Sequence, residues 1–331
     1  MGRGWVAGWV TTGVRAVVRR APLPSRVRTI PFEKVHGLGN DFVLVDALGD
    51  AALGTHAWSD LAPALCDRHT GVGADGVLVL TPATRPGTHA RMRIFNADGG
   101  DGGMCGNGIR CAARHLVEAH GVKPPLVIEV GERDYRVDVR RRDGAFVAAR
   151  AAMGVPALAA GGPEPVPADL RDACARAAPG WATVCGLDDR FGRIAMPNPH
   201  AVFFVADVAR VPLEVVGPVI ERHSLFPDRT NAQFVQVLGP GHLRVRTWER
   251  GSGITRACGT GACAALVAAH LAGLCGRQAA VDLPGGTLDI AWREDGCVEM
   301  EGPAARVFSG VWNPPAQSCP PKAVPSRGSP G

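Results

Sequence analysis

The sequence has no run of about 18 apolar residues, which is the length that a membrane-spanning helix needs. Apolar residues make up 46% of its 331 residues, and charged residues make up 20%. This composition is typical of a globular protein, and the length is enough for about two domains of ordinary size. We therefore expect a large core and no membrane association.

Acidic residues are missing from both ends of the sequence. Residues 1–30 hold six arginines and no acid, and residues 311–331 hold one lysine, one arginine and no acid. Of the 36 basic and 31 acidic residues in the chain, the part between these ends keeps 28 basic residues and all 31 acidic ones. The formal net charge of +5 therefore comes from the ends, and we expect no nucleic-acid partner.

The two ends also lack the hydrophobic periodicity of folded elements. We expect residues 1–28 to be a disordered or targeting extension, and translation from a start site upstream of the true one would produce a similar segment. Residues 311–331 are rich in proline, and we expect them to be a disordered tail.

Motifs for disulfide frameworks, zinc and dinucleotides are missing as well. The ten cysteines are scattered and no secretory signal is evident, which favours a reducing cytoplasm. The spacings Cys105–Cys111 and Cys258–Cys263 are unlike the short zinc knuckle. The glycine-rich turns do not match G-x-G-x-x-G between a strand and a helix. We therefore expect a cytoplasmic protein with no metal and no cofactor.

Glycine-rich loops that lead into a cysteine are present twice. Residues 93–111 read RIFNADGGDGGMCGNGIRC, and residues 246–263 read RTWERGSGITRACGTGAC. A gapless alignment places Cys105 on Cys258, 153 positions later. Each stretch predicts a strand, a loop and an apolar helix that begins at Cys-Gly-x-Gly.

Apolar runs and alternating patterns recur in the same order around these two stretches. We expect strands at residues 42–45, 77–80, 90–95, 126–130, 135–141, 193–205, 229–238 and 243–249. The helix from Gly261 to about Ala272 is apolar all round, which is typical of a helix buried on every side. The sequence therefore predicts an α/β (α+β) fold of two pseudo-symmetric halves, each a barrel-like sheet around a central buried helix.

The repeat also gives expected boundaries. The first half spans residues 29–156 and carries Cys105, and the second spans residues 181–310 and carries Cys258. Residues 157–180, rich in Ala and Pro, are expected to be the linker between them. A ligand cleft between the halves follows from the expected positions of the two cysteine loops.

The two matched cysteines have a chemical meaning. A cysteine in the first turn of a helix lies near unpaired N–H groups and the positive end of the dipole, and both lower its pKa. The same N–H groups can hold a carboxylate. Cys111 and Cys263 lie inside predicted helices and fit small buried hydrophobic residues, whereas Cys105 and Cys258 do not. We expect Cys105 and Cys258 to face one bound acid, and a reversible disulfide between them is a side possibility.

Polar side chains gather at the ends of predicted strands. Four asparagines lie at turns beside strands: Asn40, Asn96, Asn198 and Asn231. Ordinary turn chemistry explains any one of them, but four at corresponding positions indicate a lining for an amino-acid zwitterion. Arg250 would bind a carboxylate with two hydrogen bonds, and Glu249 would pair with an ammonium group. His200 lies in the same candidate loop region, although a lone histidine is usually structural.

Six motifs carry a resemblance to a known family: HGLGNDF at 36–42, FNADG at 95–99, CGNGIRC at 105–111, NPHAV at 198–202, ERGSG at 249–253 and ACGTGACAA at 257–265. From about Thr29 to Gly310, the chain resembles the diaminopimelate epimerases. These are cofactor-independent isomerases that interconvert LL- and meso-2,6-diaminopimelate. Proline racemases of the same fold typically carry CGHG at the first cysteine, so Asn107 favours the epimerase. The alternatives are a related amino-acid racemase and a non-catalytic binding protein of this fold.

The resemblance implies roles for individual residues. Cys105 and Cys258 would be the acid–base pair of a two-base thiol/thiolate mechanism, assisted by His200 and Glu249. The implied substrate contacts are Asn40, Asn96, Asn198, Asn231, Glu249 and Arg250, with the backbone N–H groups of Gly106, Asn107, Gly259 and Thr260. The resemblance also implies a homodimer in lysine and peptidoglycan precursor biosynthesis. Pro197 and Gly76 depart from the usual family residues, so the finer substrate contacts stay open.

Overall fold

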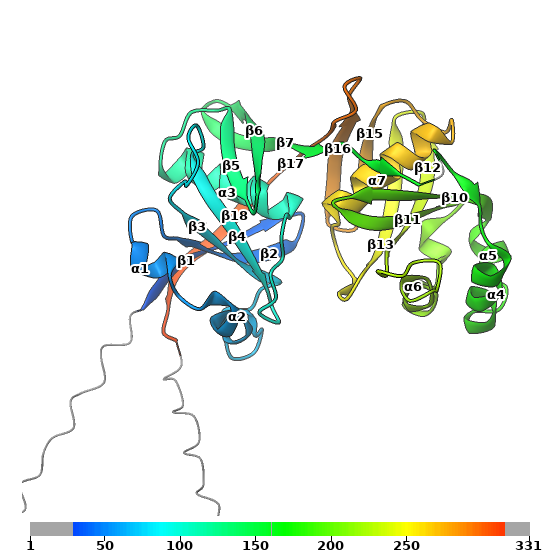
Figure 1. Ribbon diagram of the computed structural model, residues 1–331, viewed down its shortest axis with the longest axis horizontal. Helices are drawn as coiled ribbons and strands as arrows, with labels where there is room; N and C mark the ends of the chain where they lie inside the picture. The colour runs from blue at the N-terminus through cyan, green and yellow to red at the C-terminus, as the bar shows by residue number, and fades with distance from the viewer. Residues whose placement is uncertain (1–28, 160, 315–331) are drawn as a thin grey trace, which may run out of the picture. The chain divides into compact units, whose positions relative to one another are not determined.

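The computed structural model describes residues 29–159 and 161–314. The expectations for residues 1–28 and for residues 315–331 of the tail lie outside this part of the chain. The described part contains 18 strands joined by a continuous series of pairings (Figure 1). It divides into two halves that repeat the same topology.

The first half pairs its strands in chain order: β1 (Ile30–Gly37), β2 (Asn40–Asp46), β3 (Gly76–Thr81), β4 (Ala90–Asn96), β5 (Leu126–Val130), β6 (Arg133–Arg142) and β7 (Ala145–Gly154). The pairs β2–β3 and β4–β5 are parallel, and the other neighbours are antiparallel. Parallel neighbours need a long connection, and here these connections hold the helices. The helices are α1 (Ala51–Gly54), α2 (Trp58–Cys66) and α3 (Gly106–Ala119).

The second half repeats this order: β10 (Leu187–Met196), β11 (Asn198–Val205), β12 (Asn231–Gly239), β13 (His242–Glu249), β15 (Gln278–Leu283), β16 (Gly286–Trp292) and β17 (Val298–Gly302). The parallel pairs are β11–β12 and β13–β15, at the matching places. Its connections hold η1 (Val208–Arg210), α6 (Leu213–Glu221), the short strand β14 (Gly253–Ile254) and α7 (Gly259–Leu271). The predicted pseudo-symmetry is confirmed.

The central helices are buried among the strands of their own halves (Figure 1). Eleven of the 14 residues of α3 and ten of the 13 residues of α7 are buried. The sheet around α3 is covered on both faces, because Leu44 and Leu78 pack in the cluster that contains α3, whereas Val43 and Val77 pack with α2. Near-continuous apolar strands such as β2 and β3 therefore reflect two-sided burial.

The expected linker has structure of its own. Within residues 157–180, β8 (Ala157–Leu158) and β9 (Glu164–Pro165) pair with β10. The helix α4 (Ala168–Ala177) buries Leu170 and Cys174 in the core of the second half, beside the short helix α5 (Trp181–Cys185). The second half therefore begins earlier than residue 181, because this segment covers the outer strand β10.

The C-terminal strands correct the expected end of the second half. The strand β17 pairs with β7, and β18 (Ala305–Trp312) pairs with β1 in the first half. The register joins Trp312 to Ile30, so the ordered chain continues past the expected boundary at residue 310. The physical reason is that β1 would otherwise be an edge strand with unpaired N–H and C=O groups.

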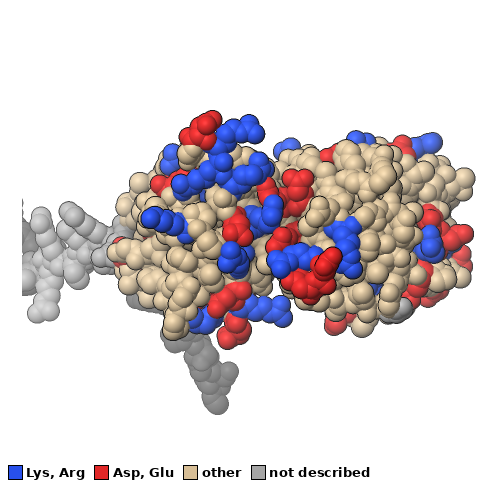
Figure 2. All heavy atoms as spheres, turned by 90° about the horizontal axis from the view of Figure 1, so that it is seen from above, with Lys and Arg blue, Asp and Glu red and all other residues tan. Residues whose placement is uncertain are grey.

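Charges of both signs are interspersed on the surface. On the face that Figure 2 draws, Lys and Arg lie among Asp and Glu, and neither sign gathers alone. Many charges of the described residues are paired, such as Arg150 with Glu301 at 2.6 Å and Arg293 with Glu299 at 2.8 Å. This agrees with the nearly balanced charge of the chain between its two ends.

Candidate active site

The two matched cysteines are the N-cap residues of the central helices. Cys105 precedes α3 and Cys258 precedes α7, both with extended backbone (φ −125° and −109°). A Cβ added to the next residue, Gly106 or Gly259, would lie 2.3 Å or 2.8 Å from the Met300 side chain. The added Cβ of Gly259 would also lie 3.8 Å from the Gly106 Cα. Glycine permits this approach, and the Cys-Gly motifs thus bring two helix starts together.

Both cysteines line one cleft with a cavity volume of about 750 Å³, within the ordinary size range of small-molecule sites. Both halves contribute to its walls. The cleft contains all of the predicted contact residues: Asn40, Asn96, Gly106, Asn107, Asn198, Asn231, Glu249, Arg250, Gly259 and Thr260. The structure therefore brings together residues that are up to 220 positions apart in the sequence.

His200 is the exception among the predicted site residues. It is 1% exposed and lies behind the cleft wall. Its Nε2 is 2.9 Å from the Asn198 Oδ1, and its Nδ1 is 3.1 Å from the Gln233 Oε1. Burial lowers the pKa of His200 to about 3, so the ring is neutral at pH 7. The contact with Asn198 makes His200 a residue that orients the wall of the cleft.

The thiols have raised pKa values, contrary to the net lowering that we expected. Burial raises the pKa of Cys105, although hydrogen bonds from the N–H groups of Gly108 and Asn107 lower it in part. Burial also raises the pKa of Cys258, well above its ordinary value, and the negative charge of Glu249 adds to this. The helix-start effect is present, but desolvation of a thiolate outweighs it here.

Glu249 and Arg250 occupy the end of β13 and the turn after it. Burial raises the pKa of Glu249, whose carboxylate accepts a hydrogen bond from the Thr255 hydroxyl. The Arg250 backbone N–H donates to the Asn231 Oδ1 at 2.9 Å, and its guanidinium donates to the Asp228 carbonyl at 2.8 Å. The loop that leads into β12 and the turn after β13 are thereby held together at the rim of the cleft.

Asn107 joins the two cysteine loops directly. Its side chain is 2% exposed, and its Nδ2 donates to the Ala257 carbonyl at 3.0 Å. The same nitrogen donates to the Asn40 Oδ1 at 3.0 Å. We expected only the backbone of Asn107 to take part in the site, and the side chain therefore adds a link between the helix starts.

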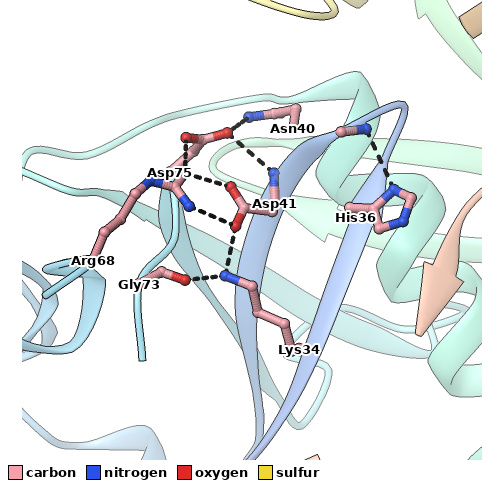
Figure 3. A network of polar contacts seen from close by, with 8 residues as sticks. Lys34, His36, Asn40, Asp41, Arg68, Gly73 and Asp75 are labelled. Carbon is pink, nitrogen blue, oxygen red and sulfur yellow. Dashed lines mark hydrogen bonds and ion pairs between the residues drawn. The ribbon is translucent and has the colours of Figure 1, made fainter. Parts of the chain in front are cut away.

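A charged network holds Asn40 in place (Figure 3). The Asn40 Oδ1 accepts from the Cys105 thiol at 3.8 Å, and its Nδ2 donates to the Asp75 Oδ2 at 2.8 Å. Asp75 is paired with Arg68 at 2.7 Å. Arg68 also pairs with Asp41 at 2.7 Å, so the network reaches the turn after α2.

The sequence patterns do not predict this network. Asp41 and Asp75 follow glycine-rich turns in HGLGNDF and GVGAD, and this was the available signal. Buried Lys34 also contacts Asp41, at 2.6 Å, and donates to the Gly73 carbonyl. No periodicity in the sequence joins a strand residue at position 34 to turns at positions 41 and 75.

The structure shows where Gly76 and Pro197, the two residues that depart from the usual family residues, lie. A Cβ added to Gly76 would lie 2.7 Å from the Phe95 carbonyl oxygen, so the neighbouring strand β4 leaves no room for a side chain there. Pro197 stands at the apex of the hairpin in which Met196 pairs with Asn198. Each is the chain neighbour of a residue that lines the cleft, Asp75 or Asn198, and neither removes one of its polar residues.

The chain is similar to known proteins over most of its length. The family model described as "Diaminopimelate epimerase" matches residues 32–156 and 193–307. The chain belongs to the diaminopimelate epimerase family. A diaminopimelate epimerase of Gloeothece citriformis (strain PCC 7424) is 44% identical over 289 residues, which are 86% of this chain and 99% of that protein. A diaminopimelate epimerase of Rhodospirillum centenum (strain ATCC 51521 / SW) is 44% identical over 286 residues, which are 84% of this chain and 91% of that protein.

Solved structures share the fold of this epimerase family member at low sequence identity. A PhzF-family phenazine biosynthesis protein of Bacillus anthracis has a TM-score of 0.63 at 15% identity, covering 86% of this chain and 99% of its own. A hydroxyproline epimerase of Agrobacterium vitis has a TM-score of 0.60 at 16% identity. The match covers 86% of this chain and 92% of that protein. Across residues 29–159 and 161–314, none of the helices is both long enough and apolar enough to cross a bilayer.

Proposed function

We propose that this chain is an isomerase that interconverts LL- and meso-2,6-diaminopimelate without a cofactor. The observation that carries the proposal is the pair of cysteines at two adjoining helix starts, on one polar cleft. Its closely similar relatives are named as epimerases of this substrate. The reaction would supply precursors of lysine and of peptidoglycan.

Two thiols supply the proton transfer in this proposal. Inversion at an α-carbon requires a base on one face and an acid on the other. One cysteine, as thiolate, removes the α-proton, and the other, as thiol, delivers a proton to the opposite face. The pair ends each turnover with its protonation states exchanged. The positive ammonium group of the bound substrate favours the thiolate that burial otherwise disfavours.

The helix starts supply the charge stabilisation. An amino-acid α-proton is weakly acidic, so its removal needs donors aimed at the negative charge that develops on the carboxylate. The N–H groups of Gly106, Asn107, Gly259 and Thr260 serve this role, because both α3 and α7 direct the positive end of their dipoles at the cleft. The hydrogen bond from Asn107 to Ala257 keeps the two sets of donors in register.

The distal end of the substrate is a second amino acid head group. Asn96, Asn198, Asn231 and Arg250 line the cleft and would bind this end. Asn40 contacts the Cys105 thiol, and Glu249 contacts Cys258. Buried polar groups left unpaired would penalise a substrate that lacks this end. His200 acts in this proposal through its hydrogen bond to Asn198 and donates no proton to the substrate.

The test is the activity of the purified full chain in cofactor-free buffer. In deuterated water, proton NMR follows α-proton exchange of LL-diaminopimelate and, separately, of L-proline and L-lysine. We expect exchange and epimerisation of diaminopimelate at least about 100-fold faster than exchange of the other two. Racemisation of proline without activity on diaminopimelate would show a related racemase, and binding without exchange would show a non-catalytic member of the fold.

We further propose that the enzyme works in the cytoplasm as a homodimer. Exposed apolar side chains on β18 support the homodimer. Val307, Phe308 and Val311 are 58%, 47% and 60% exposed. Such a patch is a candidate for burial against a second copy. Light scattering on the purified chain would measure the mass, and a monomer at micromolar concentration would contradict the proposal.

A further inference from the structure

A cluster of metal-ligating side chains lies at the end of α3 opposite Cys105. It consists of Asp46, at the end of β2, with His115 and His120, near the end of α3. The Nε2 of His115 and the Nε2 of His120 lie 3.0 Å and 2.6 Å from the same atom, the Asp46 Oδ2. Two imidazole nitrogens and one carboxylate oxygen thus all lie within 4.8 Å of one another.

A second carboxylate lies behind the buried histidine. The His115 Nδ1 is 3.0 Å from the Glu33 Oε2, and the other oxygen of Glu33 accepts from Arg306 at 3.1 Å. A ligating histidine in metalloproteins usually donates its second N–H to a carboxylate, which fixes the tautomer and the ring orientation. The second oxygen of Asp46 accepts from the Leu48 N–H at 2.9 Å, which fixes the carboxylate.

The duplicated half shows that the fold does not need polar groups at this place. The offset of 153 positions that places Cys105 on Cys258 also pairs His115 with Ala268 and His120 with Gly273. The strand registers pair Glu33 with Gly192 and Asp46 with Phe204. A Cβ added to Gly192 would lie 2.9 Å from the Ala268 Cβ, so the same strand approaches the same helix position there. The second half packs this junction with apolar residues, whereas the first half gathers four polar groups there, which pair with one another when the histidines are protonated.

We propose that Asp46, His115 and His120 bind one divalent transition-metal ion of the zinc class. Two neutral imidazoles and a carboxylate are ligands that Zn²⁺ and its neighbours prefer. The Asp46 and His120 side chains are 29% and 35% exposed, which leaves a fourth position for water. Ligand atoms around a tetrahedral ion with bonds of about 2.0–2.1 Å lie about 3.3 Å apart, so the ligands separate by several tenths of an ångström to admit it.

The site is structural in this proposal. His115 and His120 lie 10 and 15 residues after Cys105, which is about 15–22 Å along the helix axis. The ion therefore acts by fastening the end of α3 to β2 and, through Glu33, to β1. This departs from our expectation of no metal, which rested on cysteine spacing alone. The three ligands are separated by up to 74 positions, without a motif.

Cobalt titration of the chelator-stripped full chain tests the proposal. Co²⁺ is the probe because its visible d–d absorption reports the ligands, and thiolate ligands add a charge-transfer band in the near ultraviolet. We expect one Co²⁺ per chain, with d–d bands and no thiolate band. We also expect displacement by Zn²⁺ and a melting temperature that rises with metal concentration. A thiolate band, or no binding at millimolar Co²⁺, would overturn the proposal.

Variants assign the ligands. His120→Gln changes a partly exposed side chain at the helix end, so it should fold and lose Co²⁺ binding by at least about 100-fold, as should Asp46→Asn. Glu33→Gln should weaken binding by about 10-fold, because it orients His115 without touching the ion. The matched control is His270→Gln at the end of α7, which should bind as wild type does. Unchanged Co²⁺ binding by His120→Gln, with its metal-free melting temperature preserved, would exclude this ligand set.

Discussion

Cys105 and Cys258 are matched in position but differ in their surroundings. The Cys105 thiol contacts the amide oxygen of Asn40 at 3.8 Å, whereas Cys258 lies near the carboxylate of Glu249. Burial raises both pKa values, and the negative charge of Glu249 raises that of Cys258 further. The negative charge of Glu249 also raises the pKa of Cys105, where it ranks behind the hydrogen bonds from the Gly108 and Asn107 N–H groups.

Replacing either thiol should abolish epimerisation without unfolding the protein. Cys105→Ala and Cys258→Ala each remove one proton carrier, so kcat/KM for diaminopimelate should fall by about 10³-fold or more. The control is Cys297→Ala, which removes a half-buried thiol outside the cleft. Its activity should stay at the wild-type level. Turnover close to wild type in either of the first two variants would contradict the two-thiol mechanism.

For single residues, the sequence predicted those that line the cleft but few of the side chains that hold them in place. The duplicated motifs pointed to both cysteines, because a repeat places corresponding residues at corresponding ends of strands. The Asp75–Asn40 contact and the Asp46–His115 contact could not be predicted. Each joins distant segments through side chains alone, and a pattern of local periodicity contains no information on such pairs.

Among the elements, the junction of β1, β2 and the turn after α2 depends on Asp41. Burial alone would raise the pKa of Asp41, but Arg68 and Lys34 lower it to about 2. A lowered carboxyl pKa stabilises the folded state above the unfolded value of about 4, and this stability is lost as pH falls towards 2. The contribution at pH 7 is about 2 kcal/mol for a side chain that is 16% exposed.

Asp41→Asn should therefore destabilise the protein by at least about 2 kcal/mol at pH 7, because buried Lys34 also loses its partner. Urea unfolding measures the difference from wild type, which should shrink as pH falls from about 5 towards 2. The control is Asp143→Asn, at an exposed turn between β6 and β7. A difference that stays constant over this pH range would show that the charge of Asp41 is not responsible.

The elements themselves were largely predictable, since buried strands such as β3 and β12 are apolar runs and α7 is apolar all round. The expected linker contains α4 and two short strands, which its composition rich in Ala and Pro did not indicate. Propensity favours a loop for such a segment. Packing against the outer face of β10 and β11 overrides it.

For the molecule as a whole, the two halves are interlocked in sequence. The chain crosses from β7 to β8, which joins the second half, and returns from β17 to β18, which joins the first. The sequence could not reveal this exchange, because β8 and β18 are equivalent in the repeat and each could have closed either half. The consequence is that β18, the last strand of the described residues, protects β1, the first of them.

Truncation of the full chain tests this closure. The variant of residues 29–314 should keep its activity and melt within about 2 °C of the full chain, because the family match lies within residues 32–307. The variant of residues 29–303 also loses β18. It leaves β1 with an unpaired edge and removes the contact of Phe308 with Phe32, whose ring centroids are 5.9 Å apart.

The shorter variant should melt about 10 °C lower than the longer one, since a loss of several kcal/mol shifts a domain of this size by about 2–4 °C for each kcal/mol. Differential scanning calorimetry measures both variants. Because β1 leads into Asn40, which contacts the Cys105 thiol, activity should fall together with stability. Equal melting temperatures for the two variants would show that β18 is dispensable. A large fall already in the longer variant would show that the terminal segments pack on the fold.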